Sequence, residues 1–390
     1  MKKIKVLRII NRFNLGGPTY NVTFLSRFMS EEFETLLVGG VPDEYETDSL
    51  HIPESYGLHP IIIPELKRAI NYKEDKKALK KLREIIREFK PDVVHTHASK
   101  AGALGRQAAI KENVPVILHT FHGHVFHSYF GKLKTTFYKT VERRLAKKST
   151  RIICISNKQK EEIGSIHKIC PPEKIEVIPL GFDLEKFHAN KDENRKNVRA
   201  KYQLKENEIA IAIIGRLAPV KDHDFFLNVI ENLPKESITK IKVFVVGDGE
   251  LKSEIEEKTN ELNSKFGEKR VIMTSWINNI DEFNAGMDII CLTSKNEGTP
   301  VSLIEAQASG TPVISTNVGG VQDIIDEGKT GYIIEKGDLN SYVNKLNEMI
   351  QDEKMLENMS QNGWNYVKDK FSYARLCADM EKLYKKLLAE

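Results

Sequence analysis

Short apolar runs alternate with longer amphipathic segments along the whole chain of 390 residues. A short apolar run is typical of a buried strand, and apolar residues spaced three and four positions apart indicate a helix. The predicted strands of the first half lie at 4–10, 35–38, 60–63, 92–96, 115–120, 151–155 and 175–178. Those of the second half lie at 209–214, 241–246, 271–274, 288–292, 312–315 and 331–334.

Helical patterns separate most of these strands, most clearly at 74–89 and 133–148. Strands that alternate with helices are typical of parallel βα units, and each series has enough strands to fill one doubly wound sheet. The sequence therefore predicts an α/β protein made of two Rossmann-like domains. Two further helical patterns, 353–368 and 374–388, have no strand after them.

The two series meet at residues 179–183, Pro-Leu-Gly-Phe-Asp, which are followed by the charged stretch 190–197. We expect a hinge there, because a chain of this length can form two domains that each have a core. The N-terminal domain is then 1–178 and the C-terminal domain 179–372. The final helix, 373–390, is expected to pack back on the N-terminal domain.

The composition is that of an ordinary globular protein, with 40% hydrophobic and 29% charged residues. The net charge of +4 is small for this length and does not indicate nucleic-acid binding. No stretch approaches the roughly 18 apolar residues of a membrane-spanning helix, and the first apolar run is too short for a signal peptide. The four cysteines have no CxxC spacing, so we expect reduced core residues in a cytoplasmic protein.

Residues 294–305 concentrate the chemistry of the second half, because a predicted strand leads there into a loop and a helix. Glu297 lies in the loop and Glu305 lies in the helix. We expect Thr299 to cap this helix and Pro300 to occupy its first turn, where a missing N–H is tolerated. The N–H groups and the positive dipole end of such a helix bind anions. The segment thus predicts a phosphate site with carboxylates nearby for hydroxyl groups.

Two cations, Arg216 and Lys221, follow the predicted strand 209–214. They should lie at the carboxyl end of that strand, where open α/β sheets bind ligands. Cations that bind a leaving diphosphate more strongly as its charge develops lower the barrier to its departure. Such a pair supplies the charge that a metal ion often provides, so we predict neither a metal nor a cofactor.

Six histidines occur between positions 95 and 127, and this density raises the alternative of a metal site. Their spacing does not match that of a metalloprotease helix, and His95, His97 and His119 fall at the ends of predicted strands. We therefore expect no metal there. His124 and His127 are candidates for a substrate pocket, although they can equally be histidines that only pack within a loop.

Taken together, the motifs resemble those of the family 4 glycosyltransferases, whose GT-B fold has two Rossmann-like domains facing a central cleft. The resemblance covers nearly the whole chain, in the family's order. The motifs of the first half are GGPT at 16–19, VVHTH at 93–97, TFHG at 120–123, ICIS at 153–156 and VIPLGFD at 177–183. Those of the second half are GRLAPVKD at 215–222, VGDGE at 246–250, Glu297 with Glu305, GTPVI at 310–314 and VGG at 318–320.

The resemblance implies retaining transfer of a sugar from a nucleotide sugar without a metal. Arg216 and Lys221 would bind the donor diphosphate, and Glu297 would face the sugar. Glu305 would accept hydrogen bonds from the ribose hydroxyls. His122 matches the family histidine that faces the transferred sugar. In a front-face mechanism the leaving phosphate takes the acceptor proton, so His122 would orient the sugar rather than act as a base.

Other positions are expected to contact the substrates through their backbone. Gly16 and Gly17 would approach the diphosphate or the acceptor from the N-terminal domain, and the backbone at Ile277 would hold the base, which suits uracil. Closure about the hinge would bring the two halves of the site together. The residues whose peptide groups would line the sugar and diphosphate are Gly298, Thr299, Pro300 and Val301.

Three positions depart from the usual family pattern: Leu180 where Asn is frequent, Gln307 in place of Met, and Asp323 in place of Glu. None of them removes a charged group assigned to the donor site. The departures therefore bear on the choice of sugar more than on the class of enzyme.

Other functions share part of this pattern. A GT-B-fold sugar-nucleotide epimerase would hydrolyse its donor, but it would not have the Arg216/Lys221 and Glu297/Glu305 set in this form. A non-catalytic sugar-nucleotide-binding protein would not need the complete charged set. A glycosidase also uses two carboxylates, but it needs no phosphate site. The leading prediction is a hexosyltransferase that uses a UDP-sugar.

Residues 132–148 predict a basic amphipathic helix with Leu133, Phe137, Val141 and Leu145 on one face. Such a helix suits an anionic membrane surface, but it can equally pack on the sheet with its basic face in water. With the resemblance, it suggests a glycan or lipid-linked acceptor in cell-surface polysaccharide synthesis. Peripheral contact of a cytoplasmic protein with the inner face of the membrane is the corresponding hypothesis.

Overall fold

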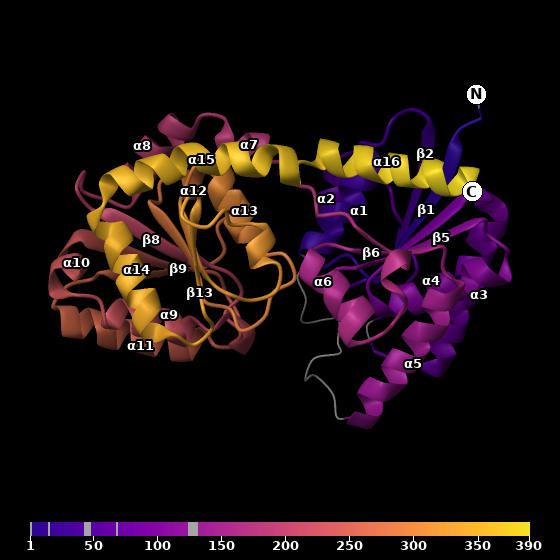
Figure 1. The fold of residues 1–390 in the computed structure, drawn as a ribbon, viewed down its shortest axis with the longest axis horizontal. Coiled ribbons are helices and arrows are strands. Elements are labelled where there is room, and N and C mark those ends of the chain that lie inside the picture. Colours follow the sequence, from indigo (N-terminus) through magenta and orange to yellow (C-terminus); the bar gives the residue numbers. More distant parts are fainter. Residues whose placement is uncertain (1, 15, 43–47, 68, 124–131) are drawn as a thin grey trace. The chain divides into compact units, whose positions relative to one another are not determined.

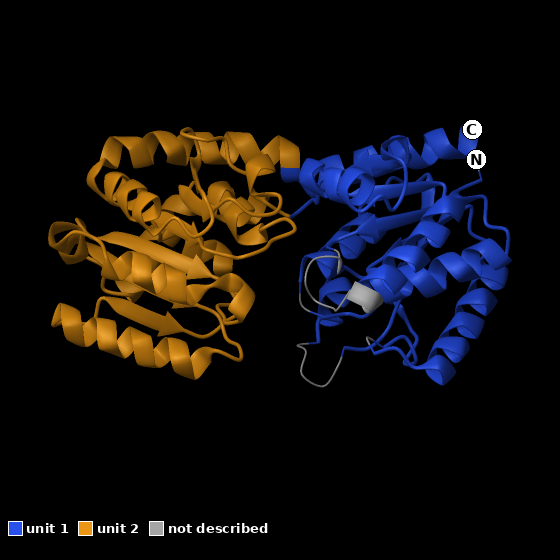
Figure 2. Cartoon of the chain, turned by 60° about the horizontal axis from the view of Figure 1, so that its bottom comes forward, with its two compact units in different colours: residues 1–182, 371–390 blue, residues 183–370 orange. Residues whose placement is uncertain are grey.

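The computed structural model describes residues 2–14, 16–42, 48–67, 69–123 and 132–390. The chain forms two compact units, which are residues 1–182 with 371–390 (unit 1) and residues 183–370 (unit 2) (Figure 2). The boundaries expected from the sequence, 178 and 372, lie within a few residues of these bounds.

Unit 1 is built on a parallel sheet whose described strands have the order β3-β2-β1-β4-β5-β6-β7. The strands are β1 (Ile4–Ile10), β2 (Phe33–Gly39), β3 (Ile61–Ile62), β4 (Val93–His97), β5 (Val116–Phe121), β6 (Arg151–Cys154) and β7 (Ile175–Val177). Its helices are α1 (Gly17–Arg27), α2 (His51–Ser55), α3 (Tyr72–Phe89), α4 (Ser99–Lys111), α5 (Lys132–Lys148), α6 (Asn157–Glu161) and α16 (Tyr373–Ala389).

Unit 2 has a second parallel sheet, with the strand order β10-β9-β8-β11-β12-β13. The strands are β8 (Ile209–Ile214), β9 (Ile241–Val246), β10 (Val271–Thr274), β11 (Ile289–Leu292), β12 (Val313–Thr316) and β13 (Gly331–Ile334). Its helices are α7 (Glu185–His188), α8 (Lys191–Lys201), α9 (His223–Glu231), α10 (Lys235–Lys240), α11 (Lys252–Phe266), α12 (Ile280–Ala285), α13 (Val301–Ala308), α14 (Leu339–Gln351) and α15 (Glu353–Phe371).

The predicted α/β fold with two doubly wound sheets is confirmed. Helices cover both faces of each sheet, so the strands are apolar on both sides and read as continuous runs. Side chains still alternate between the faces. In β1, Val6 belongs to the core cluster that contains residues of α16, whereas Leu7 and Ile9 belong to the cluster that contains residues of α3.

The C-terminal helix α16 packs on the sheet of unit 1 (Figure 1). Its buried residues Leu376, Met380 and Leu383 share one cluster with Val6 of β1 and Leu118 of β5. Because this helix is remote in sequence from the rest of unit 1, the chain must enter and leave unit 2 at neighbouring points.

These two points are joined by backbone hydrogen bonds. Phe182 N donates to Phe371 O at 2.8 Å, and Tyr373 N donates to Phe182 O at 3.0 Å. Gly181 lies so close that an added Cβ would be 2.6 Å from the Cβ of Leu376. A side chain at position 181 would therefore push apart the two hydrogen-bonded segments around Phe182 and Phe371.

Both sheets reverse their strand order once, between β1 and β4 in unit 1 and between β8 and β11 in unit 2. Ligands of open α/β sheets bind beyond the carboxyl ends of the strands at such a switch point. The loops that follow β1, β4, β8 and β11 are therefore the expected positions of a ligand-binding site.

The structure also bears on the expectations for the cysteines and for membrane-spanning helices. All four cysteines are buried and unpaired. Among the described residues, none of the helices is both long enough and apolar enough to cross a membrane.

Candidate active site

The loops after β8 and β11 bring Lys221 and Glu297 into an ion pair. Lys221 Nζ lies 2.6 Å from Glu297 Oε1, and Ser294 Oγ donates to the same oxygen at 2.6 Å. The side chains of Lys221 and Glu297 are 24% and 11% exposed, so the pair is accessible but partly desolvated. A partly buried cation and carboxylate interact more strongly than a pair in open water.

Backbone contacts join the two loops. Lys221 ends a short 3-10 turn, Pro219–Lys221. Thr293 Oγ1 donates to Lys221 O at 3.2 Å and to Asp222 O at 3.0 Å. These bonds tie the Lys221 backbone to the end of β11, which fixes the origin of the side chain.

Arg216, the other predicted cation, is exposed near the start of the same loop, just after β8. Within the described parts of the chain it has no hydrogen-bond or ion-pair partner for its guanidinium. A fork of donors without a protein partner is available for an anionic ligand.

The backbone of Glu297 and Gly298 rests on the Val318-Gly319-Gly320 turn. Gly320 N donates to Gly298 O at 2.9 Å. Gly319 has a φ of +55°, and a Cβ there would lie 1.8 Å from Glu297 O. Only glycine combines this left-handed conformation with this close approach, so Gly319 sets the position of the Glu297 backbone.

The expected capping of the following helix is wrong. Pro300, with φ −71° and ψ 99°, is the N-cap residue itself, α13 begins at Val301, and no side chain caps the helix. Thr299 lies one residue further back, and its buried hydroxyl has no hydrogen-bond partner among the described residues. The first N–H groups of α13 therefore have no side-chain cap and can bind an anion.

Glu305 lies in the second turn of α13 and is partly buried. Burial raises the pKa of its carboxyl group to about 7, although Lys186 of α7 opposes this shift. No hydrogen bond satisfies this carboxyl group within the described chain. An acceptor held in such a place suits a ligand that brings its own hydroxyl donors.

Gln307, one of the departures from the family pattern, has a structural role. Its fully buried side chain donates from Nε2 to Leu303 O at 3.0 Å and to Ile324 O at 3.1 Å. It thereby ties α13 to the turn that follows Gly320.

Ile277 lies in the loop after β10 and lines a hollow that is separate from the Lys221–Glu297 pair. This hollow has a volume of about 420 Å³ and is formed by the 276–279 loop together with α8 and α12. Neither Lys221 nor Glu297 lines it. The role of the Ile277 backbone in holding a base stays a prediction.

In unit 1, Gly16 and Gly17 form the start of α1 at the carboxyl end of β1. Gly16 is the N-cap with a φ of +156°, Pro18 occupies the first turn, and no side chain caps the helix. This is a second uncapped helix start at a switch point, and it can approach an anionic group closely.

His122 directly follows β5 and pairs with a histidine of β4. Its Nε2 lies 2.9 Å from His97 Nδ1, and the two rings are stacked with centroids 5.2 Å apart. Burial lowers the pKa of His122 to about 4 and also lowers that of His97. Both rings are therefore neutral near pH 7, so one donates and the other accepts.

The remaining histidines of the cluster are held by neutral partners. His95 Nδ1 lies 2.6 Å from Tyr384 Oη, and its Nε2 lies 2.7 Å from Thr120 Oγ1. His119 Nδ1 lies 2.9 Å from Thr96 Oγ1. Among the described residues, no group of three or more His, Cys, Asp or Glu side chains has the arrangement of a metal site. His124 and His127 lie outside the described residues.

Several functional neighbours were not assigned a role from the sequence: Ser294, Thr293, Gly319 and His97. Ser294 and Thr293 directly follow an apolar strand, and that position was the available signal. His97 lies in the VVHTH motif and was weighed as a metal candidate, but neither observation gave it a role beside His122. The contact of Gly319 with Glu297 joins distant parts of the chain, and no local pattern could indicate it.

Two doubly wound parallel domains, with a cation–carboxylate pair and uncapped helix starts at the switch points, define a GT-B-fold glycosyltransferase. The chain belongs to glycosyltransferase family 4. A family model described as "Glycosyltransferase Family 4" matches residues 16–186, and one described as "Glycosyl transferases group 1" matches residues 194–366.

Two curated relatives match over most of their length. The UDP-Gal:alpha-D-GlcNAc-diphosphoundecaprenol alpha-1,3-galactosyltransferase of Escherichia coli is 34% identical over 361 residues, which cover 91% of this chain and 89% of that protein. The capsular polysaccharide biosynthesis glycosyltransferase CapM of Staphylococcus aureus is 28% identical, over 84% of this chain and 85% of CapM.

Solved structures share the fold at lower identity. HepE of Anabaena, crystallised with UDP, superposes with a TM-score of 0.81 at 16% identity, over 98% of this chain and all of HepE. WaaG, a glycosyltransferase of lipopolysaccharide biosynthesis, gives a TM-score of 0.72 at 17% identity, over 98% of this chain and 99% of WaaG.

Proposed function

We propose that this enzyme is a retaining, metal-independent hexosyltransferase that moves a sugar from a UDP-sugar to a glycan or lipid-linked acceptor in cell-surface polysaccharide synthesis. The observation that carries the proposal is the Lys221–Glu297 pair beside the uncapped start of α13. The cation can bind a diphosphate, and the carboxylate can accept hydrogen bonds from sugar hydroxyls. The uncapped helix N–H groups can donate to phosphate oxygens.

The donor diphosphate is bound by Arg216, by Lys221 and by the first N–H groups of α13. As the bond from the anomeric carbon to the phosphate oxygen breaks, negative charge grows on the departing UDP. Interactions that strengthen with this charge lower the barrier. Lys221 then shares its ammonium group between Glu297 and the diphosphate, while Glu297 accepts hydrogen bonds from the sugar.

Retention follows from attack on the face that the leaving group vacates. The acceptor oxygen bonds to the anomeric carbon, the carbon–oxygen bond to UDP breaks, and the hydroxyl proton passes to the phosphate oxygen. No protein base is required. His122 has a pKa of about 4 and is therefore a weak base, which supports its role in orienting the sugar.

The relatives support the choice of substrates. The Escherichia coli relative is named for a UDP-galactose donor and a diphosphoundecaprenol-linked acceptor, and CapM is named for capsular polysaccharide biosynthesis. Glu305 fits a ribose because a partly buried carboxylate gains from two neighbouring hydroxyl donors.

We also propose peripheral contact of helix α5 with the anionic inner surface of the cytoplasmic membrane. Leu145 packs in unit 1, but Phe137 is 61% exposed on a helix that carries several cations. An exposed aromatic residue beside lysine and arginine suits an interface between acyl chains and headgroups. Leu133, predicted to lie on the same face, has no described side chain.

The proposal is tested by incubating the enzyme with UDP-, GDP- and ADP-sugars, with and without undecaprenyl-diphosphate-linked acceptors and with EDTA in parallel. We expect nucleotide release that depends on a UDP-sugar and an acceptor and that persists in EDTA. Proton NMR of the product should show that the anomeric configuration of the donor is retained.

Other outcomes would replace the proposal. Epimerised free sugar without an acceptor would indicate a sugar-nucleotide epimerase. Binding of the nucleotide sugar without turnover would indicate a non-catalytic binding protein. An inverted product would refute retention and leave only transfer.

A further inference from the structure

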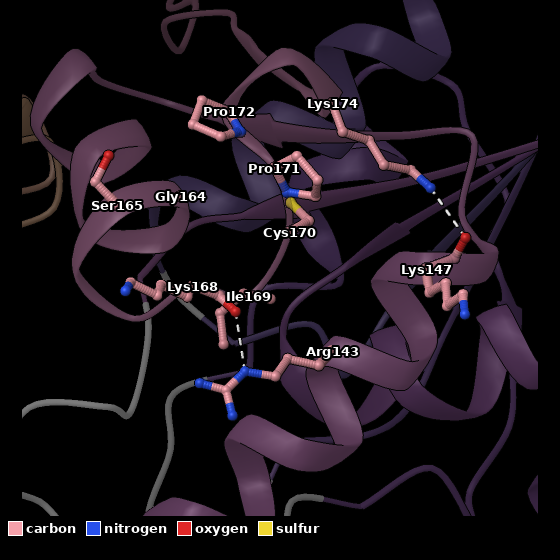
Figure 3. A pocket seen from close by; sticks show the side chains of 10 residues that line it. All are labelled: Arg143, Lys147, Gly164, Ser165, Lys168, Ile169, Cys170, Pro171, Pro172 and Lys174. Atoms are coloured by element: carbon pink, nitrogen blue, oxygen red, sulfur yellow. Dashed lines mark hydrogen bonds between the residues drawn. The ribbon is translucent and has the colours of Figure 1, made fainter.

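The C-terminal half of α5 and residues 164–174 form a hollow of about 780 Å³ in unit 1, which we name the basic hollow (Figure 3). None of the residues assigned to sugar transfer lines it. Its floor is apolar, with Ile169, Cys170 and two prolines, and its rim is cationic. The rim cations are Arg143, Lys147, Lys168 and Lys174.

The rim cations surround the floor rather than cluster at one point. Lys168 lies on one side of the hollow, and Lys174 and Lys147 lie on the other (Figure 3). Arg143 is held between them because it donates from Nε to Lys168 O and from a terminal nitrogen to His167 O, both at 2.9 Å. Its remaining guanidinium N–H groups have no partner among the described residues.

No acidic side chain lines the basic hollow, and none of its four cations forms an ion pair with a described carboxylate. Elsewhere on α5, a carboxylate does form an ion pair with a cation. Arg106 of α4 is fully buried and lies 2.6 Å from Glu142 of α5. The fold thus neutralises a buried cation with a carboxylate nearby, while it leaves the rim of the hollow positive.

The Cys170 thiol does not compensate this charge, because burial raises its pKa to about 11 and the thiol stays neutral. Burial also lowers the pKa of Lys174, which works against the positive charge of that side chain. The carbonyl end of α5 is partly negative, but Lys174 already bonds it at Lys147 O, 3.0 Å away. The ammonium groups of Lys147 and Lys168 and part of the Arg143 guanidinium have no protein partner among the described residues.

The backbone of the hollow has an uncommon conformation. Helix α6 continues into a π-helical turn, Glu162–Ile166, and π turns are rare and frequently found at functional sites. Lys168 follows with a φ of +49°, which is uncommon for a residue other than glycine. This conformation directs the carbonyl groups of His167 and Lys168 toward Arg143.

We propose that the basic hollow binds the phosphate group of a molecule that also has an apolar part. An arginine fork with lysine point charges is the set that proteins use for phosphate, and the apolar floor suits the carbon chain beside it. A second hollow, of about 400 Å³, shares Lys147 and adds Lys111, Arg144 and Lys148, which extends the positive surface around α5. The proposal does not depend on the transfer reaction.

A phospholipid headgroup and a soluble phosphate ester share this chemistry, and the test has one arm for each. The first arm is co-sedimentation with vesicles of equal parts phosphatidylcholine and phosphatidylglycerol, against vesicles of phosphatidylcholine alone. The second is calorimetric titration with inorganic phosphate and with glycerol 3-phosphate. The variant is Lys147→Gln/Lys168→Gln, because no described hydrogen bond uses either ammonium group.

The matched control is Lys382→Gln/Lys386→Gln, which removes the same charge from exposed positions of α16 in the same unit. We expect roughly a thirtyfold loss of binding in the hollow variant and little loss in the control. Loss with vesicles alone identifies a headgroup, and loss with soluble phosphate identifies a free ester. Equal loss in both variants, or no binding by the unaltered protein in either arm, overturns the proposal. If the double variant does not fold, Lys168→Gln alone gives the same comparison.

Discussion

His97 and His122 are hydrogen-bonded to each other, with His97 Nδ1 and His122 Nε2 separated by 2.9 Å. Since both rings are neutral near pH 7, one of these two nitrogens donates and the other accepts, so the tautomer of His122 is coupled to that of His97. The other ring nitrogen, His122 Nδ1, is buried and has no partner among the described residues. His97 therefore decides whether His122 offers a donor or an acceptor to the sugar.

Replacing His97 should affect turnover more than donor binding. Loss of one buried hydrogen bond of about 1–3 kcal/mol would let the His122 ring reorient, so we expect kcat of His97→Ala to fall roughly 5- to 100-fold with a smaller change in KM. His97→Asn, whose amide nitrogen can occupy the place of Nδ1, should restore most of the rate.

Steady-state kinetics and thermal unfolding of both His97 variants make the measurement. If His97 only fills space, both variants would lose stability while the folded fraction keeps its kcat. That result would contradict a positioning role.

The cations of unit 2 should be needed for transition-state stabilisation. We expect Arg216→Ala and Lys221→Ala each to lower kcat/KM roughly 100- to 1,000-fold, because each removes charge that opposes the developing diphosphate. The control is Lys295→Ala, which removes a neighbouring, more exposed cation that lies 3.1 Å from Asp222. Lys221→Ala also leaves Glu297 without its cation, and unfolding curves measure this loss of stability separately from the loss of rate. Near-normal rates in both the Arg216 and the Lys221 variant would refute the site.

The fold could be predicted closely because its strands are buried on both faces. The run IAIAII at 209–214 and the run IKVFVV at 241–246 are the observed β8 and β9 without a change of boundary. Parallel strands covered by helices leave no polar alternation to obscure the signal. Because the strands of both domains are continuous apolar runs, the break between the two groups of strands at 179–183 could also be predicted.

The site could be predicted in its residue types but not in its contacts. Lys221 and Glu297 are 76 positions apart, and only the pairing of β8 with β11 brings them together. The cap at Thr299 was wrong because Pro300, which such a cap would place in the first turn, has an extended backbone, and the Gly320–Gly298 hydrogen bond ties the loop before it to a distant turn. Local propensity gave a reasonable cap, and a tertiary contact replaced it.

Glu305 should make donor binding and stability depend on pH in opposite ways. Its pKa is raised from 4.5 to about 7, so the folded protein holds this proton more tightly than the unfolded chain. Stability from this group therefore decreases as pH rises from about 4.5 to about 7. A ribose needs the ionised acceptor, so UDP should bind more weakly as pH falls below about 7.

Glu305→Gln tests both parts. The neutral amide should raise the melting temperature at pH 8 and leave it nearly unchanged at pH 4, while it weakens UDP binding at pH 8. Calorimetric titration with UDP and thermal unfolding at both pH values make the comparison. A variant that is less stable at pH 8 would show that the carboxylate is not strained by burial.

Gly319→Ala should displace Glu297 and so disable the enzyme. A Cβ at position 319 would lie 1.8 Å from Glu297 O, which is backbone and cannot move without the whole loop. A displacement of about 1 Å in a catalytic group lowers the rate roughly 100-fold. The matched control is Gly328→Ala, because Gly328 also has a positive φ, +76°, but a Cβ there meets nothing within 4 Å. Both variants lose about 1 kcal/mol from the left-handed conformation, so the difference in kcat and in melting temperature isolates the contact with Glu297. Equal behaviour of the two variants would mean that the Gly319 turn does not position this carboxylate.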